Sequence, residues 1–538
     1  MVSAYLVKIE PIQRLQERVF REVMGHAALL AQTHPELLAQ VACRSFLNEL
    51  PDDQQARERR ESRERASRIA ALRAKPEAER TRNEQRALDY LPMSIMSGRS
   101  ISHHDWDRLS IGADFQGYFP ASPLREPFHA LLAHAPAVGR ALVRDLANHA
   151  VLAWRQLHRH SGRGGTPLPL VLEFPWGRQE FWGAPQHYTW SRGHGGPHAL
   201  ECAMMALEQS ALQQLAAGRP AAELLRELVE GHTSIAVLSI AVLVALRALE
   251  VSAVSLPLVS SHRLWRLDLD RSSQERQLQS ANLIGFASDD AHRKAVVEAG
   301  EIQERNLDLR CLVQLFALGP DEGLRSACRA ALDRFPFELE LEYAESAPSE
   351  AQLAELRRNG ELWAEFGHQE NYVRVPIPGR TDVVGIEMRS ARHAAPEILA
   401  ARQRHEEIAR ESELWLWVEK CFESGALAPG LDSTEAVERA KAMAAAVAAG
   451  TAASLMPGHA VAHACIAGTA AAVLCFDGPD EHAGWARSTL EVYRDHVEAP
   501  ADDLFAKSRN PWHPKLFVAR ALAASIWNCR EQADDRAA

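Results

Sequence analysis

The sequence lacks the short motifs by which nucleotide-binding and zinc-protease sites are usually identified. The phosphate-binding pattern G-x-x-x-x-G-K-[ST] is absent, as is a convincing G-x-G-x-x-G. The glycine-rich stretch at 161–165, SGRGG, therefore predicts a flexible break. His459 and His463 are spaced to share a metal ion, but they read HAVAH, without the glutamate of H-E-x-x-H or an acidic third ligand. We interpret them as core or interface histidines, and we expect no metal and no cofactor.

Disulfide frameworks and membrane spans are also poorly supported. None of the eight cysteines forms a C-x-x-C pair, and several, such as Cys202 and Cys465, fall in apolar helical runs, which is typical of buried thiols in a reducing cytoplasm. The N-terminus lacks the pattern of a signal peptide. The apolar run 235–246 is too short to span a bilayer. The segment 442–476 has no charged side chain, but it is mostly Ala and Gly and is divided by Pro-Gly, so we expect two buried helices there. A cytoplasmic protein without a membrane partner is predicted.

Length and charge set further limits. A chain of 538 residues exceeds what one core usually serves, so two to four domains or a repeat array are expected. Its 46% hydrophobic and 24% charged residues are ordinary for a globular protein. The net charge of −11 argues against a dedicated nucleic-acid surface.

What the sequence does contain is helical periodicity. Acidic and basic residues alternate at helical spacing over 52–89, which predicts an exposed helix that Pro76 breaks in two. Pro197 opens a helix that ends at Gly218, and two more helices follow by about residue 249. Three helices joined by tight turns are typical of stacked αα-hairpins.

The predicted fold is mainly α, an irregular α-helical repeat (αα-hairpin or HEAT-like) scaffold with small β insertions. Strands are expected at 168–174, at 337–343 where FELELEY alternates, and in a hairpin of 372–377 with 382–388. We divide the chain into four parts: 1–89, N-terminal helices; 90–330, a helical domain with an aromatic-rich insert at 166–196; 331–392, a small β-containing insertion; and 393–538, an Ala-rich helical domain.

The aromatic insert concentrates large side chains among glycines and prolines. Its members are Trp176, Phe181, Trp182, Tyr188 and Trp190, followed by Arg192. Two interpretations stand. The rings plug a gap between helical layers, since Trp and Tyr bury large areas and keep a polar handle. Alternatively, they form an anchor surface for another protein, because Trp, Tyr and Arg dominate interface hot spots.

Two histidine clusters are weaker candidates. His194 and His198 flank Gly-Gly-Pro at a helix start, where free amides and Arg192 would favour an anion; a structural turn is the simpler interpretation. The stretch 103–107 holds His103, His104, Asp105 and Asp107, which suits acid–base chemistry, but no nucleophile accompanies it.

The segments WGAPQHYTWSRGHGGPHALECAMMALEQSALQQL, EGHTSIAVLSIAVLVAL and HRLWRLDLDR together resemble a region found C-terminal to the ATPase core of large bacterial STAND-type (NACHT-like) NTPases associated with anti-phage defence. The resemblance extends loosely over 90–530. It implies a helical sensor that binds a trigger protein while an NTPase module elsewhere turns over nucleotide, and it carries over no catalytic residue. The matching positions, which we interpret as mostly structural, are Trp182, Gly183, Tyr188, Trp190, Ser191, Arg192, Glu201, Ala206, Leu207 and Glu208.

The sequence thus predicts a helical protein-recognition scaffold whose partner is a phage protein, an associated NTPase module or both. Two alternatives stay open. One is a divergent hydrolase that uses His103, His104 and Asp105 or His459 and His463. The other is a purely structural subunit, for which the aromatic insert would be wholly buried.

Overall fold

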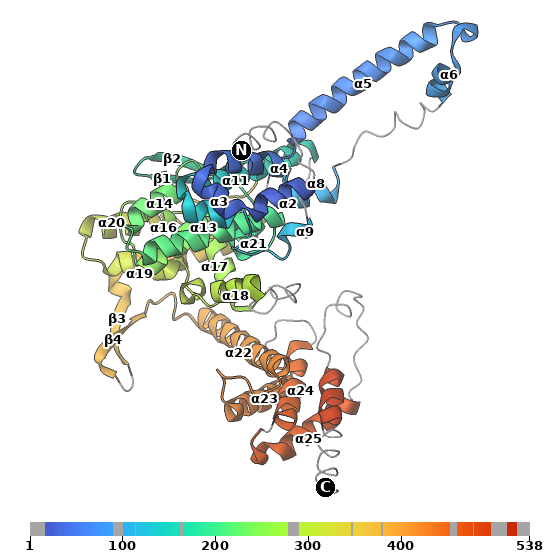
Figure 1. Ribbon diagram of the computed structural model, residues 1–538. Helices are drawn as coiled ribbons and strands as arrows, with labels where there is room; N and C mark the ends of the chain where they lie inside the picture. Colours follow the sequence, from blue (N-terminus) through green and yellow to red (C-terminus); the bar gives the residue numbers. More distant parts are fainter. Residues whose placement is uncertain are drawn as a thin grey trace. The chain divides into compact units, whose positions relative to one another are not determined.

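The computed structural model describes residues 17–89, 101–112, 115–161, 165–277, 290–345, 348–377, 380–451, 460–476, 478–495 and 514–524. Within these residues the chain is mainly α-helical with two small two-stranded sheets, which confirms the predicted fold class (Figure 1). It divides into two compact units, called unit 1 (Met1–Arg389) and unit 2 (Ser390–Ala538) below.

The first part of unit 1 consists of short helices and two long ones. They are α2 (Glu17–Gly25), α3 (Ala27–Thr33), α4 (Pro35–Phe46), α5 (Pro51–Ala74), η1 (Glu77–Glu79), α6 (Arg82–Asp89), α8 (His103–Arg108), α9 (Phe115–Tyr118), α10 (Phe128–His134) and α11 (Pro136–Ser161). Helices that follow each other along the chain pack in pairs, such as α3 with α4 and α10 with α11, as expected for helical hairpins.

The second part of unit 1 begins with the aromatic insert and ends with a hairpin. Its elements are β1 (Leu170–Phe174), β2 (Gly177–Phe181), α12 (Pro185–Tyr188), η2 (Trp190–Arg192), α13 (His198–Ala216), α14 (Ala221–Val229), α15 (Ala236–Ala248), α16 (Leu256–Val259), α17 (His262–Gln277), α18 (Asp290–Gly300), η4 (Gln303–Asn306), α19 (Leu309–Leu318), α20 (Glu322–Leu332), α21 (Glu350–Ala364), η5 (Glu365–Gly367), η6 (Gln369–Asn371), β3 (Tyr372–Ile377) and β4 (Arg380–Met388).

The core of unit 1 is one hydrophobic cluster that extends from Val23 to Phe335. Helix α15 lies at its centre: every residue from Ala236 to Leu246 is buried, and the helix contacts α13, α14 and α19. The dense apolar run in the sequence is therefore a central core helix. The cluster includes residues on both sides of the boundaries that we placed at 89/90 and 330/331.

The β structure follows the sequence in part. β1 and β2 form an antiparallel hairpin in which Leu170 lies opposite Phe181, so the insert holds a second strand where only turns are predicted. The predicted hairpin of β3 and β4 is present. The predicted strand at 337–343 is wrong, because only Tyr343 forms a bridge, with Pro167. The acidic side chains of this segment instead bond to Ser261 and to arginines of α17.

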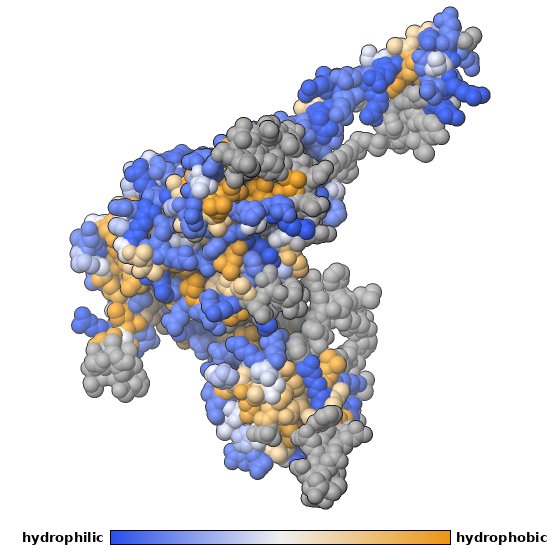
Figure 2. All heavy atoms as spheres, in the orientation of Figure 1, coloured by the Kyte–Doolittle hydropathy of each residue, from blue (hydrophilic) through white to orange (hydrophobic). Residues whose placement is uncertain are grey.

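Helix α5 extends away from the rest of unit 1 and buries none of its residues (Figure 1). It ends at Ala74, before Pro76, as predicted. The Arg80 guanidinium then donates hydrogen bonds to backbone carbonyls at the end of the helix, among them that of Leu72 at 3.1 Å. Figure 2 shows this arm as hydrophilic over most of its visible face, with a short hydrophobic stretch near the end. A helix this polar has no core to hold it, so its own ion pairs, such as Arg57 with Glu61, support it.

Unit 2 is helical and rich in alanine. It contains α22 (Pro396–Ser424), α23 (Ser433–Ala448), α24 (Ala460–Cys475) and α25 (Asp480–Asp495). Asp432 caps α23 by accepting backbone N–H groups. A Cβ at Gly468 would lie 2.4 Å from a Val418 methyl group, so α22 and α24 are in close contact there. Among the residues that the structure describes, no helix has the length and apolarity needed to cross a bilayer.

A buried cluster of charges joins the aromatic insert to α13. Arg192 of η2 forms ion pairs with Glu208 of α13 and Glu275 of α17, and Arg305 of η4 also pairs with Glu208. Burial opposes ionisation of Glu208, but the charges of Arg192 and Arg305 outweigh it and keep the pKa of this carboxyl below its usual value. The group is therefore a buried carboxylate shared by two guanidinium groups.

The cluster continues through α17 to α19. Arg271 pairs with Glu275 at 2.7 Å and with Asp268 at 2.8 Å. Asp268 accepts a hydrogen bond from the Tyr188 hydroxyl at 3.0 Å and another from the backbone N–H of Leu309 at 2.9 Å. Six segments of unit 1 are thus tied together, namely α12, η2, α13, α17, η4 and α19, by side chains that are buried except for the partly exposed Glu275.

We expect Glu208→Gln to lower the free energy of unfolding by about 3–5 kcal/mol, because it leaves two buried guanidinium groups without their shared counter-charge. Urea denaturation followed by circular dichroism measures the change. Glu322→Gln is the control, since it breaks an ion pair of an exposed carboxylate with Arg325 and should cost less than about 1 kcal/mol. Equal stabilities of the two variants would contradict the role of the cluster.

Candidate functional site

The aromatic insert is partly core and partly surface. Phe181, Tyr188, Trp190 and Arg192, four of the six residues that we predicted to bind protein, are buried. Tyr188 and Arg192 belong to the charged cluster, and the indole N–H of Trp190 donates to the carbonyl of Gly195 at 3.2 Å. These four side chains are structural in unit 1, which agrees with the plug interpretation for this half of the insert.

Trp176 and Trp182 are only partly buried, and an arginine covers each ring. The guanidinium carbon of Arg155 lies 3.5 Å from the centroid of Trp182, and that of Arg226 lies 5.7 Å from the centroid of Trp176. The Trp176 ring also stacks on Phe174, with centroids 4.6 Å apart and planes 9° from parallel. The two tryptophans flank β2, so the hairpin holds both in fixed positions.

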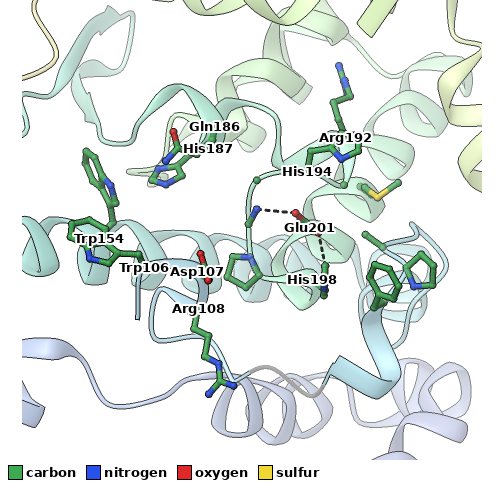
Figure 3. A pocket seen from close by; sticks show the side chains of 18 of the residues that line it. Trp106, Asp107, Arg108, Trp154, Gln186, His187, Arg192, His194, His198 and Glu201 are labelled. Atoms are coloured by element: carbon green, nitrogen blue, oxygen red, sulfur yellow. Dashed lines mark hydrogen bonds and ion pairs between the residues drawn. The ribbon is translucent and has the colours of Figure 1, made fainter. Parts of the chain in front are cut away.

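A cavity of about 860 Å³ lies between α8 and the start of α13; we name it the α8–α13 cavity (Figure 3). Its walls come from α8, the segment Phe119–Ala121, α12, the glycine-rich loop Gly193–Pro197 and the first turns of α13, with Trp154 of α11 and Val296 of α18. The volume is within the range of small-molecule sites. The two histidine clusters of the sequence thus meet here, because His104 and Asp107 face the same space as His194 and His198.

One wall of the cavity is aromatic. The His187 ring meets Trp154 edge-on at 5.3 Å, and Trp154 and Trp106 each meet the ring of His158 edge-on, at 4.7 and 4.8 Å. His187 is 2% exposed, and the backbone N–H of Ala184 donates to its Nδ1 at 3.1 Å. Burial, with a smaller contribution from His158, lowers the pKa of His187 to about 3. The ring is therefore neutral, with its proton on Nε2.

The glycine-rich loop forms the opposite wall. Gly195 has φ of +81°, and a Cβ at Gly196 would lie 2.4 Å from the Nε1 atom of Trp190, so a larger residue would push the loop off the insert. Glu201, 2% exposed, accepts the N–H of Gly196 at 2.8 Å and lies 3.0 Å from Nδ1 of His198. A carboxyl group therefore already occupies the helix start where the sequence suggested an anion, and Arg192 is paired elsewhere. The structural turn is the better interpretation.

The structure gives the acid–base candidates at 103–107 other roles. The His103 side chain is exposed and lies 2.8 Å from Asp107. Asp105 accepts hydrogen bonds from the N–H and hydroxyl of Ser102 and so caps α8. Only His104 and Asp107 reach the cavity, and no Ser, Thr, Cys or Lys is among the described residues that line it.

The remaining candidates do not assemble. His459 lies outside the described residues, and Nδ1 of His463 lies 2.9 Å from the Tyr493 hydroxyl. Across the described ranges, no group of three or more His, Cys, Asp or Glu side chains is arranged to hold a metal ion. Burial raises the pKa of the Cys202 thiol to about 12, which makes it a packing residue instead of a nucleophile.

The sequence analysis missed three cavity residues, His187, Trp106 and Trp154. Trp106 lies within the stretch 103–107, and His187 lies within the aromatic insert, so both belong to segments that the sequence marks as candidates. Nothing in the sequence indicates that Trp154, in the middle of a long helix, faces them.

Three buried histidines predict that unit 1 loses stability as the pH falls. Burial lowers the pKa of His187 and of His232 to about 3 and that of His262 to about 4. In the unfolded chain the pKa of each histidine is near 6.5. Below this pH the unfolded chain therefore binds protons at these histidines, whereas the folded chain does not. Each histidine should then remove about 2 kcal/mol between pH 7 and pH 5, a window above the titration of ordinary carboxylates.

His187→Phe tests this sign directly, because it deletes one of the titrating groups and keeps a ring of similar shape. Urea denaturation at pH 7 and pH 5 should show a pH-dependent loss that is smaller in the variant by about 2 kcal/mol. An unchanged loss would mean that His187 is not buried in its neutral form.

No protein-family model matches the chain, and no curated protein matches it. The resemblance to the C-terminal region of STAND-type NTPases therefore stays a prediction, and the case for a function rests on the geometry of the described residues.

Proposed function

We propose that this chain is a helical recognition scaffold that binds a protein partner through the Trp–Arg surface, defined as Trp176, Trp182, Arg155 and Arg226. The observation that carries the proposal is the pairing of each partly exposed indole with a guanidinium group. Trp and Arg are enriched among the residues that dominate binding energy at protein interfaces. Here both rings are held by a hairpin packed on the core, so little side-chain freedom would be lost on binding.

The α5 arm supports a role in contact with other molecules. It buries no residue over Pro51–Ala74, about 36 Å of helix at 1.5 Å per residue. Its interleaved charges would favour a polar partner surface over an apolar groove. The arm is a second contact area, whereas the Trp–Arg surface would supply the anchors.

The partner that the resemblance implies is an NTPase module or a phage protein. In this proposal nucleotide turnover belongs to the partner module, and this chain contributes shape and contact area. Binding would shift the partner's conformational equilibrium through a difference in affinity between its two states.

The test uses the full chain and each candidate partner separately: the product of the neighbouring gene and individually expressed phage proteins. We expect at least one to form a complex in size-exclusion chromatography and isothermal titration calorimetry. Trp176→Ala with Trp182→Ala should weaken that complex at least about thirtyfold, since a hot-spot side chain contributes 2 kcal/mol or more.

The matched control is Trp485→Ala in unit 2, where Lys441 lies 5.9 Å from the centroid of another partly buried indole. This variant should bind as the wild type does. The proposal fails if no candidate binds, or if the double variant in unit 1 binds as tightly as the control.

A further inference from the structure

The α8–α13 cavity contains a hydrogen-bond donor that no protein group among the described residues uses. The Nδ1 atom of His187 accepts the Ala184 N–H, which leaves the proton on Nε2. The side chain as a whole is 2% exposed and lines the cavity (Figure 3). Its Nε2 atom is not among the fully buried unpaired atoms, so a ligand acceptor would take the place of solvent as its partner. The edge contact with Trp154 fixes the direction of the donor.

Flat apolar surface lies around this donor. Trp106 contributes a partly exposed indole ring, and the buried side chains of Trp154, Met205 and Val296 line the cavity as well. Phe119 is half exposed at the other side and packs on the His198 ring, with centroids 5.0 Å apart. A planar ring system would find stacking surface here, as nucleobases do on the aromatic side chains of proteins that bind them.

The charges in the wall argue against a phosphorylated ligand. Two carboxylates, Glu208 and Glu275, already neutralise the Arg192 guanidinium, although its Nη2 atom has no hydrogen-bond partner among the described residues; the side chain extends away from Glu201 (Figure 3). Arg108 is exposed, so its attraction for an anion is screened by solvent. The Glu201 carboxyl has accepted two hydrogen bonds and retains lone pairs for a further donor, such as an amino group.

From this arrangement we propose that the cavity binds a nucleobase or an unphosphorylated nucleoside. Such a molecule offers a planar ring for the indoles, a ring acceptor for Nε2 of His187 and an amino or hydroxyl donor for Glu201. The cavity of about 860 Å³ is large enough for a base with its sugar. The site is separate from the Trp–Arg surface, so the proposal stands without a protein partner.

The experiment titrates the purified full chain with adenosine, guanosine, cytidine and uridine, with the free bases, and with the corresponding 5′-monophosphates. Isothermal titration calorimetry gives the affinity, and quenching of tryptophan fluorescence reports on the indole wall. We expect at least one base or nucleoside to bind, and its 5′-monophosphate to bind at least tenfold more weakly.

His187→Phe removes the donor and should weaken binding about tenfold, the value of one neutral hydrogen bond to a buried group. His232→Phe is the control, because this histidine is equally buried but lies outside the cavity wall. Trp106→Ala, at a partly exposed position, tests the indole wall if the core variant does not fold as judged by circular dichroism.

Binding that weakens in both cavity variants and not in the control supports the proposal. It is overturned if no base or nucleoside binds at millimolar concentration. It is likewise overturned if a monophosphate binds as tightly as its nucleoside, or if the cavity variants bind as well as the control.

Discussion

The carboxylate of Glu208, shared between Arg192 and Arg305, is the interaction on which the part of unit 1 around both candidate surfaces depends. Three arginines and three carboxylates meet here through Glu275, Arg271 and Asp268, and all are buried except the partly exposed Glu275, so the cluster is neutral as a whole. Taking these charges out of water costs a great deal of free energy, and pairing of opposite charges offsets that cost. Such a cluster tolerates no sliding of one segment against another. It therefore specifies the position of η2, and of the glycine-rich loop that follows it, more tightly than apolar packing alone would.

The charged cluster around Glu208 fixes the positions of both candidate surfaces. On the inner side, Arg192 leads directly into Gly193–Pro197, the loop that forms one wall of the α8–α13 cavity. On the outer side, Tyr188 is bonded to Asp268, so the segment between β2 and η2 cannot swing out. Trp182, at the end of β2, is then held beneath Arg155. The residues of the resemblance fit this division, because all ten except Trp182 are buried. The matching residues, apart from Trp182, are thus packing residues of the insert. The partly exposed tryptophans and the cavity are the surfaces that this packing holds in place.

Local chemistry made some elements predictable. Pro197 and Gly218 mark α13, Pro76 follows the end of α5, and the alternation at 372–388 gives β3 and β4. The other elements could not be predicted, because they depend on contacts between residues far apart in the sequence. The alternation of FELELEY is that of a strand, but Glu340 and Glu342 find Ser261 and Arg266 on α17 instead of a neighbouring strand. Arg192 looked like an interface residue because its partners lie on distant helices. The cavity could not be predicted for the same reason. Its walls come from α8, α11 and α13, and no sequence pattern indicates that these helices lie together.

The two histidines His103 and His187 have pKa values that are shifted in opposite directions. The hydrogen bond to Asp107 raises the pKa of the exposed His103. His187 behaves in the opposite way: burial lowers its pKa to about 3, so the ring is neutral near neutral pH, and the hydrogen bond from Ala184 keeps its proton on Nε2. Because the folded state does not protonate His187 whereas the unfolded chain does, the free energy of unfolding falls in acid. A donor fixed in this manner can discriminate ligands by the position of an acceptor atom, because its own proton is held on Nε2.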